Sequence, residues 1–336
     1  MIRDAEALLA QIRAIHETIR DTVVAATEQQ AIEELSAAVG DEAGDTIYAI
    51  DRVSEAALLD QFGRVAERWP CVLVAEGLGE TGVLVLPLGS DATAAEVTII
   101  VDPIDGTRGL MHQKRSAWIL TGVAAGTHGT LADIELAVMT EIPLVKQHLC
   151  DTLWALAGQG AHGERYNRIT GARTVLTLRP SRATSIAQGF GGLARFFPGI
   201  RAELAAIDDT VVAAVLGEQP AGRALAFEDQ YISTGGQLYE LIIGHDRWVA
   251  DLRALFGPWL TAQGKPPILC CHPYDLCSEL VAREAGVIVT DGAGAWLAAP
   301  LDVTTDCAWA GFANAALHAQ VWPALSAELR ARGVVG

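Results

Sequence analysis

Residues Val97 to Thr107 read Val-Thr-Ile-Ile-Val-Asp-Pro-Ile-Asp-Gly-Thr, and this stretch decides how the rest of the chain is interpreted. The run before Asp102 is β-branched and mainly apolar, which predicts a buried strand. Asp102 and Asp105 then fall in a tight turn, because Pro103 fixes one backbone angle and Gly106 tolerates conformations that other residues resist. Such a turn can direct both carboxylates to one point, where they repel each other unless a cation lies between them. The alternative is an ordinary surface turn, since Asp-Pro and Asp-Gly are common turn dipeptides.

The composition indicates a soluble protein with a large core. The chain has 336 residues, enough for two domains, and 51% of them are hydrophobic. No apolar stretch approaches the roughly 18 residues that a membrane helix needs, so no membrane partner is expected. Residues 1–20 carry charges throughout, which predicts an amphipathic helix and not a signal peptide. The six cysteines form no Cys-x-x-Cys pair, and they suggest reduced thiols in a cytoplasmic protein without a zinc site.

The net charge of −17 argues against a nucleic-acid polymer as partner, because such a partner favours a basic surface. If the substrate is an anion, something local must reverse the sign of the charge that it meets. A bound divalent metal ion would do so.

Hydrophobic periodicity predicts helices and strands in two blocks. Residues 1–39 and 54–69 are expected to be helical, with Ser54 as the N-cap of the second helix. Strands are expected at 72–75, 83–88, 97–101, 118–125 and 134–140. Beyond about residue 180, helical and strand-like segments alternate. We therefore expect an α+β domain over residues 1–180 and an α/β domain over residues 181–336, in which 198–227 is hard to interpret and suggests a surface insertion.

Further acidic residues stand at the ends of the expected elements. Asp45 and Asp51 precede the second helix, Glu76 follows the strand at 72–75, and Asp275 begins a helix expected to run to Gly286. Taken singly, each has an ordinary explanation. Glu76 would be a solvated loop carboxylate, and Asp275 a helix cap.

Taken together, these segments resemble the inositol monophosphatase superfamily of Mg²⁺-dependent, Li⁺-sensitive sugar phosphatases, including its histidinol-phosphate phosphatase and fructose-1,6-bisphosphatase branches. The hexapeptide Asp102–Thr107 matches the central motif of that family in full. The other motifs are matched in chain order by Asp45 and Asp51, Glu76, Tyr274-Asp275, Glu284-Ala285-Gly286 and Ala310–Leu317. The resemblance covers roughly residues 5–325. It implies a layered αβαβα sandwich, combining α+β and α/β parts, with the active site between two domains.

The resemblance also implies a role for each residue of the set. The metal ligands would be Glu76, Asp102, the Ile104 carbonyl, Asp105 and Asp275, holding two or three Mg²⁺ ions with Asp102 as a bridge. The catalytic residues would be Asp51, Thr107 and Glu76, of which Asp51 and Thr107 orient the attacking water. Phosphate and substrate contacts would come from Gly106, Thr107, Arg108, Ser233, Thr234 and Gly235. Oxygen ligands suit Mg²⁺, and two ions about 3.5–4 Å apart can stabilise both the attacking and the leaving oxygen.

The chain departs from inositol monophosphatases proper at two places. Arg108 directly follows the central motif, as also occurs in the histidinol-phosphate phosphatase branch, and Lys114 and Arg115 lie nearby. These cations would contact a second anionic group or form a solvated basic loop. Ile268 stands where the family has a glutamate that binds inositol hydroxyls. The substrate is therefore open among inositol phosphate, histidinol phosphate, a sugar bisphosphate and 3′-phosphoadenosine phosphate.

Two hypotheses follow from the resemblance. The first is a cytoplasmic Mg²⁺-dependent hydrolase of a small phosphorylated metabolite, in the homodimeric form that is usual in the superfamily. The second is a non-catalytic protein of the same fold that binds a phosphometabolite or regulates another protein. The complete carboxylate set with Thr107 favours the enzyme, because degenerate members usually lose a ligand or the water-orienting pair.

Overall fold

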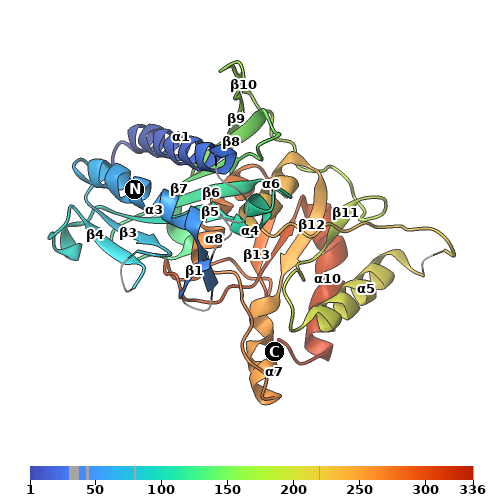
Figure 1. Ribbon diagram of the computed structural model, residues 1–336. Helices are drawn as coiled ribbons and strands as arrows, with labels where there is room; N and C mark the ends of the chain where they lie inside the picture. The colour runs from blue at the N-terminus through green and yellow to red at the C-terminus, as the bar shows by residue number, and fades with distance from the viewer. Residues whose placement is uncertain (30–37, 43–44, 79–80, 219, 336) are drawn as a thin grey trace.

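The protein is a five-layered sandwich of helices and sheets (Figure 1). The computed structural model describes residues 1–29, 38–42, 45–78, 81–218 and 220–335, and for residues 38–57 it describes the backbone alone. Helices α1 (Ala5–Gln29) and α3 (Ala49–Ala66) cover one face of a large sheet. Helices α6 (Thr234–Ile243) and α9 (Glu279–Glu284) lie between this sheet and a smaller one. The outer face of the smaller sheet is covered by α5 (Arg201–Leu216) and α10 (Ala315–Ala331).

The large sheet has eight strands, and one parallel pair in it positions the site. In spatial order the strands are β10 (Arg173–Val175), β9 (Ala161–Asn167), β8 (Leu149–Leu156), β7 (Ile134–Ile142), β6 (Ala117–Ala125), β5 (Val97–Asp105), β3 (Cys71–Ala75) and β4 (Val83–Leu86). Neighbouring strands are antiparallel except β3 and β5, which run parallel. The carboxyl ends of β3 and β5 therefore meet at one edge of the sheet.

The smaller sheet has four strands in the order β11 (Phe190–Leu193), β12 (Asp246–Asp251), β14 (Trp309–Phe312) and β13 (Ile288–Asp291). A separate ribbon pairs β1 (Ala38–Glu42) with β2 (Asp45–Tyr48). The remaining short elements are η1 (Ala92–Ala94), α4 (Thr107–Met111), η2 (Leu131–Asp133), η3 (Arg253–Phe256), α7 (Gly257–Ala262) and α8 (Pro273–Leu276). None of the helices described here is both long and apolar enough to cross a lipid bilayer.

The core explains why β5 begins as an almost unbroken apolar run. Ile99 and Val101 pack into the apolar cluster beneath α1 and α3, whereas Ile100 packs into the cluster between the two sheets. A strand that is buried on both faces needs apolar residues at successive positions and not only at alternate ones. All six cysteines are buried and carry free thiols, which confirms the prediction of reduced core residues.

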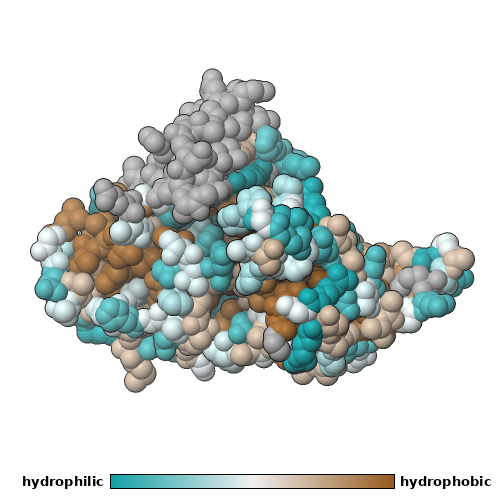
Figure 2. Space-filling view, turned by 90° about the horizontal axis from the view of Figure 1, so that it is seen from below, coloured by the Kyte–Doolittle hydropathy of each residue, from teal (hydrophilic) through white to brown (hydrophobic). Residues whose placement is uncertain are grey.

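The edge strand β4 borders an apolar part of the surface. Val83 is 41% exposed and Leu88 is 75% exposed. Figure 2 shows apolar residues gathered on the side of the molecule on which β4 lies in Figure 1.

Several boundaries differ from those expected. The first helix ends at Gln29, and residues 38–42 form a strand, so the prediction of a helix over 1–39 was wrong in its last part. Ser54 lies inside α3 and does not cap it, because the helix begins at Ala49. Ala49–Val53 carries further apolar residues that extend the helical pattern upstream.

The helix expected from Asp275 to Gly286 is two helices. The first, α8, ends at Leu276, and α9 begins at Glu279. The stretch at 198–227 contains α5, which packs against α10 as part of the outer layer. The last strand of the large sheet ends at Val175 and β11 begins at Phe190, while a domain division at residues 180 and 181 stays a prediction.

Candidate active site

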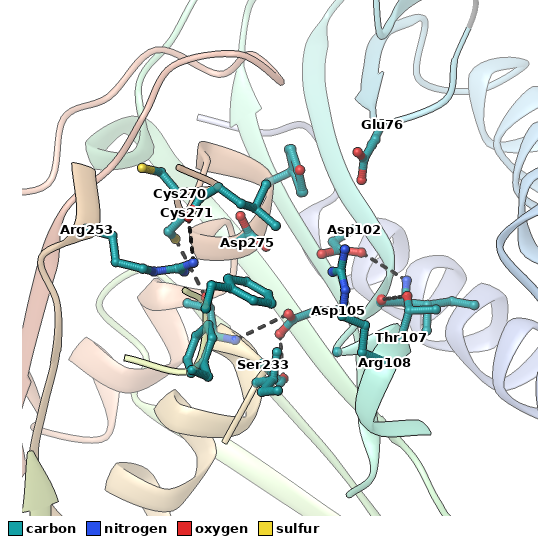
Figure 3. Close-up of a pocket in the computed structure, with 18 residues that line it drawn as sticks. Glu76, Asp102, Asp105, Thr107, Arg108, Ser233, Arg253, Cys270, Cys271 and Asp275 are labelled. Atoms are coloured by element: carbon teal, nitrogen blue, oxygen red, sulfur yellow. Dashed lines mark hydrogen bonds between the residues drawn. The ribbon is translucent and has the colours of Figure 1, made fainter. Parts of the chain in front are cut away.

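The parallel pairing of β3 with β5 brings two acidic residues to one edge of the large sheet. Ala75 is in register with Val101, so the next residues, Glu76 and Asp102, lie side by side where the pairing of β3 with β5 ends. Figure 3 shows both side chains at the same pocket. The sequence prediction is confirmed for Glu76, which follows the last residue of β3, whereas Asp102 lies within β5, which continues to Asp105.

The hexapeptide is not a simple turn, because β5 continues through it with a bulge. Asp102 pairs with Leu120 of β6 and Asp105 pairs with Trp118, which leaves one extra residue on β5. The chain then turns at Gly106, whose φ is 93°. A Cβ atom at Gly106 would lie 3.0 Å from the Ile232 carbonyl oxygen, so a side chain would both strain the backbone and collide with the segment before α6.

A third carboxylate comes from a distant part of the chain. Asp275 lies in α8, where its Oδ2 accepts a hydrogen bond of 2.6 Å from the backbone N–H of His272. It points toward Asp102 and Asp105 (Figure 3), and each of the three side chains offers an oxygen within 4.8 Å of the other two. This is the convergence that the family resemblance implied. Glu76 faces the same pocket but stands outside this tight group.

The three aspartates are electrostatically unfavourable without a counter-charge. Burial, followed by the charges of Asp105, Asp275 and Glu76, raises the pKa of Asp102 well above its usual value. Burial and the charge of Asp105 do the same for the pKa of Asp275. Burial raises the pKa of Asp105 to about 6, although hydrogen bonds to its carboxylate oppose the shift. A divalent cation fits this set, because carboxylate oxygens are its preferred ligands and its charge would offset the repulsion.

The N-terminus of α6 holds Asp105. Ser233 Oγ donates to Asp105 Oδ2 at 2.7 Å, and the backbone N–H of Gly235 donates to the same oxygen at 2.6 Å. The Thr234 N–H donates to Oδ1 at 3.3 Å. Ser233 Oγ also caps the helix by accepting from the Gly236 N–H at 2.9 Å. The three residues expected to contact substrate therefore contact a carboxylate of the cluster.

Thr107 is the first residue of α4, as expected, and its hydroxyl donates to the Ile104 carbonyl at 2.9 Å. The Ile104 N–H in turn donates to Asp102 Oδ1 at 3.0 Å. These two bonds fix the backbone oxygen that was predicted as a metal ligand beside the carboxylate of Asp102. Asp51 lies in α3, but its side chain is outside the described residues, so its pairing with Thr107 stays a prediction.

The three cations near the central motif separate into two groups. Arg108 lines the carboxylate pocket, with its guanidinium carbon 5.2 Å from the ring centre of Phe197. Lys114 and Arg115 line a different cavity, where Arg115 forms an ion pair with Asp229. Of these cations, Arg108 is the one that lies beside the predicted phosphate site.

Sequence reasoning missed the wall of the pocket that faces the cluster. This wall contains the two aromatic residues Phe196 and Phe197, the cation Arg253, and the thiols of Cys270 and Cys271. These residues come from a loop, a single 3₁₀ turn and an isolated β-bridge. None of them belongs to a local motif with a chemical signature, so only the fold brings them together.

Comparisons with known proteins agree with this architecture. The family model for inositol monophosphatases matches residues 4–190. The extragenic suppressor protein SuhB from Bartonella henselae is similar in structure, with 14% sequence identity and a TM-score of 0.64, over 95% of this chain and 98% of that chain. Leishmania major fructose-1,6-bisphosphatase in its holo form has 13% identity and a TM-score of 0.68, over 98% of this chain and 96% of that chain.

An IMPase from Thermotoga maritima has 15% identity and a TM-score of 0.59, over 97% of this chain and 98% of that chain. No curated protein sequence matches this chain. At such low identities the similarity concerns the fold, and it confirms the layered sandwich that the sequence resemblance implied.

Proposed function

This chain belongs to the inositol monophosphatase family, and on that basis we propose that it is an enzyme that hydrolyses a small phosphate monoester with the help of Mg²⁺. The observation that supports this most directly is the meeting of Asp102, Asp105 and Asp275 in one pocket. Folding brings three carboxylates together, two of them buried and one half-buried, at an electrostatic cost that is expected of a cation site and serves no purpose in an inert core.

The ions would be held by Asp102, Asp105 and Asp275, with Glu76 and the Ile104 carbonyl as further ligands. When bound, Mg²⁺ would offset the negative charge of the cluster, attract the phosphate group and make water a stronger nucleophile. We propose that the site binds two or three ions, which is the number that the family resemblance implies.

The residues of the chain would divide the remaining work. We assign the orientation of the attacking water to the Thr107 hydroxyl and the Asp51 carboxylate, with Asp51 accepting its proton. The N–H groups of Gly106 and Thr107 and the guanidinium of Arg108 would contact the phosphate oxygens. Ser233, Thr234 and Gly235 would act through Asp105, since their hydrogen bonds hold that carboxylate.

The proposed partner is a small phosphorylated metabolite. The cytoplasmic location and the homodimer remain proposals that rest on the family resemblance. Light scattering of the purified protein would decide the oligomeric state.

Phosphate release from a panel of esters, measured with Mg²⁺ and with a chelator, tests the function. The panel should contain inositol 1-phosphate, histidinol phosphate, a sugar bisphosphate and 3′-phosphoadenosine 5′-phosphate. We expect Mg²⁺-dependent release from at least one ester, and loss of that release in Asp275→Asn with the fold retained. Mg²⁺ binding without hydrolysis of any ester would instead favour the non-catalytic binding protein.

A further inference from the structure

One wall of the pocket, opposite the carboxylate cluster, is aromatic. The loop that follows β11 places Phe196 and Phe197 in the pocket lining, with their rings 4.9 Å apart and nearly perpendicular. Both residues are only partly buried, so part of each ring faces the cavity. The two rings and the carboxylates therefore border the same space.

Arg253 contacts both rings of this wall and is itself held in place by several partners. Its guanidinium forms an ion pair with Asp251, with Nε 2.8 Å from Oδ1, and the side chains of the pair are 5% and 1% exposed. Nη1 donates to the Leu269 carbonyl at 2.7 Å. The guanidinium carbon lies 4.6 Å from the ring centre of Phe196 and 5.1 Å from that of Phe197. The carboxylate of Asp251 balances the charge of the Arg253 guanidinium. Arg253 therefore holds the two phenylalanine rings against the end of β12, where Asp251 lies.

Further contacts fix the backbone of the same loop. The Arg195 N–H donates to Gln230 Oε1 at 2.8 Å, and the guanidinium of Arg201 donates to the carbonyls of Arg195 and Phe196. Gly199 lies so close to Ile268 that a Cβ atom there would be 2.7 Å from Ile268 Cγ2. Ile268 thus supports the aromatic loop at the position where inositol monophosphatases proper have a hydroxyl-binding glutamate.

The rest of this wall offers little to a polyol. Its other residues are Ile232, Leu269, Cys270 and Cys271, which present apolar groups and weakly hydrogen-bonding thiols, and Tyr274, whose hydroxyl is already hydrogen-bonded to His272 Nδ1 at 3.4 Å. A ring carrying several hydroxyl groups would lose water there without gaining partners. A planar aromatic ring would instead gain contact with the rings of Phe196 and Phe197.

Resting on the phosphatase function proposed above, we propose that the substrate is a phosphate monoester whose alcohol part carries a planar aromatic ring, and that this ring binds against Phe196 and Phe197. The phosphate lies at the carboxylate cluster, and the ring extends to the opposite wall. These phenylalanines then determine specificity, while the cluster carries the chemistry.

The test compares esters that differ in the ring, of which benzyl and cyclohexylmethyl phosphate share a primary leaving alkoxide. Benzyl phosphate has a planar ring, cyclohexylmethyl phosphate has an apolar ring without π electrons, and inositol 1-phosphate has a hydroxylated ring. We expect kcat/KM for benzyl phosphate to exceed that for cyclohexylmethyl phosphate by about tenfold, mainly through KM, and that for inositol 1-phosphate by more.

Phe197→Leu keeps an apolar side chain and removes the ring, so the preference for benzyl phosphate should fall to about threefold or less. Phe196→Leu provides a second, independent variant. Phe190→Leu is the matched control, because Phe190 packs against Phe227 with the rings tilted at 54° and does not line this pocket. It should keep the full preference.

The outcomes separate the inference from the proposed function. Equal rates for benzyl and cyclohexylmethyl phosphate, or faster hydrolysis of inositol 1-phosphate, would overturn the inference and leave the phosphatase intact. If no ester is hydrolysed, the phosphatase proposal fails. Calorimetry in Mg²⁺ then compares the affinities of benzylphosphonate and cyclohexylmethylphosphonate, which test binding to the aromatic wall without hydrolysis. Equal affinities would then overturn the aromatic site, whereas tighter binding of benzylphosphonate that Phe197→Leu removes would support it.

Discussion

The hydroxyl of Ser233 donates a hydrogen bond of 2.7 Å to Oδ2 of Asp105 across 128 residues of sequence. Ser233 caps α6 in the layer between the sheets, and Asp105 ends β5 in the large sheet. The helix that lies between the two sheets therefore positions a carboxylate of the cluster.

Ser233→Ala should weaken both the fold and the metal site. It removes a hydrogen bond to a buried carboxylate and the cap of α6, so we expect a loss of about 1–3 kcal/mol in the free energy of unfolding. The affinity for Mg²⁺ should fall by about tenfold or more, because Asp105 loses a group that orients it. Urea unfolding and Mg²⁺ titration measure the two effects. Ser90→Ala, at an exposed loop position, is the control, and an unchanged Mg²⁺ affinity in Ser233→Ala would contradict the positioning role.

Asp275→Asn should stabilise the metal-free protein while abolishing activity. A carboxyl group whose pKa is raised by folding destabilises the native state at neutral pH, and this penalty disappears as the pH falls through the folded-state pKa. Asparagine removes the charge and keeps an oxygen for the His272 N–H. We expect the Tm in chelator to rise by about 2 °C or more, the shift that about 1 kcal/mol produces in a large domain.

The same variant should lose most of the Tm increase that Mg²⁺ gives the unchanged protein. Asp60→Asn, at an exposed position of α3, should leave both values as they are. A lower metal-free Tm together with an intact response to Mg²⁺ would show that Asp275 lies outside the cation site.

His16 should make the stability depend on pH. Its ring is fully buried between Thr121 and Thr140, with ring nitrogens 2.8 and 3.0 Å from their hydroxyl oxygens, and burial lowers its pKa to about 3. The unfolded chain takes up a proton near pH 6.5 and the folded chain does not, so this contribution to stability is present above pH 6.5 and is lost as the pH falls toward 3.

When the pH falls from 7 to 5, the free energy of unfolding of the unchanged protein should decrease by about 2 kcal/mol more than that of His16→Gln. Urea unfolding at both pH values gives this difference directly. His128→Gln, at an exposed position, should behave like the unchanged protein. Identical pH dependence in His16→Gln and the unchanged protein would mean that His16 takes up a proton in the folded state as readily as in the unfolded chain.

Glu284 should stabilise the packing of α9 on the large sheet without affecting catalysis. Its carboxylate accepts from the N–H groups of Gly158 at 2.8 Å and Gly160 at 2.7 Å, which joins α9 to the β8–β9 turn. Glu284→Gln turns an amide group toward one of these donors, so we expect a loss of about 1–2 kcal/mol in stability with kcat within about twofold of normal. Glu67→Gln, at an exposed position that follows α3, is the control for removing a charge. A large fall in kcat at full stability would contradict this structural role.

The sequence predicted the cluster better than its surroundings, for a physical reason. Asp102 and Asp105 are positioned by local features, namely a buried strand, a proline and a glycine, and these can be read in a short segment. The hydrogen bonds that hold Asp105 depend on where α6 packs, so Ser233 was expected to contact substrate although it contacts the cluster.

The aromatic wall could not be predicted at all. Phe196 and Arg253 belong to segments without periodicity, and their contact exists only because Asp251 and Leu269 hold the guanidinium in place. The break between α8 and α9 was missed for a similar reason, since the apolar spacing continues through it. The strands of the large sheet were predicted more easily, because buried strands carry apolar residues at successive positions.

The distance in sequence between Asp105 and Asp275 has a consequence for how the protein folds. Charges so far apart along the chain repel each other strongly only once the tertiary structure is nearly complete. Folding therefore brings these charges together at an electrostatic cost, and a cation that enters the site offsets that cost. Metal affinity and native-state stability are thus linked through the repulsion among the carboxylates. A change that lets the carboxylates move apart lowers this repulsion and also weakens the binding of the ion.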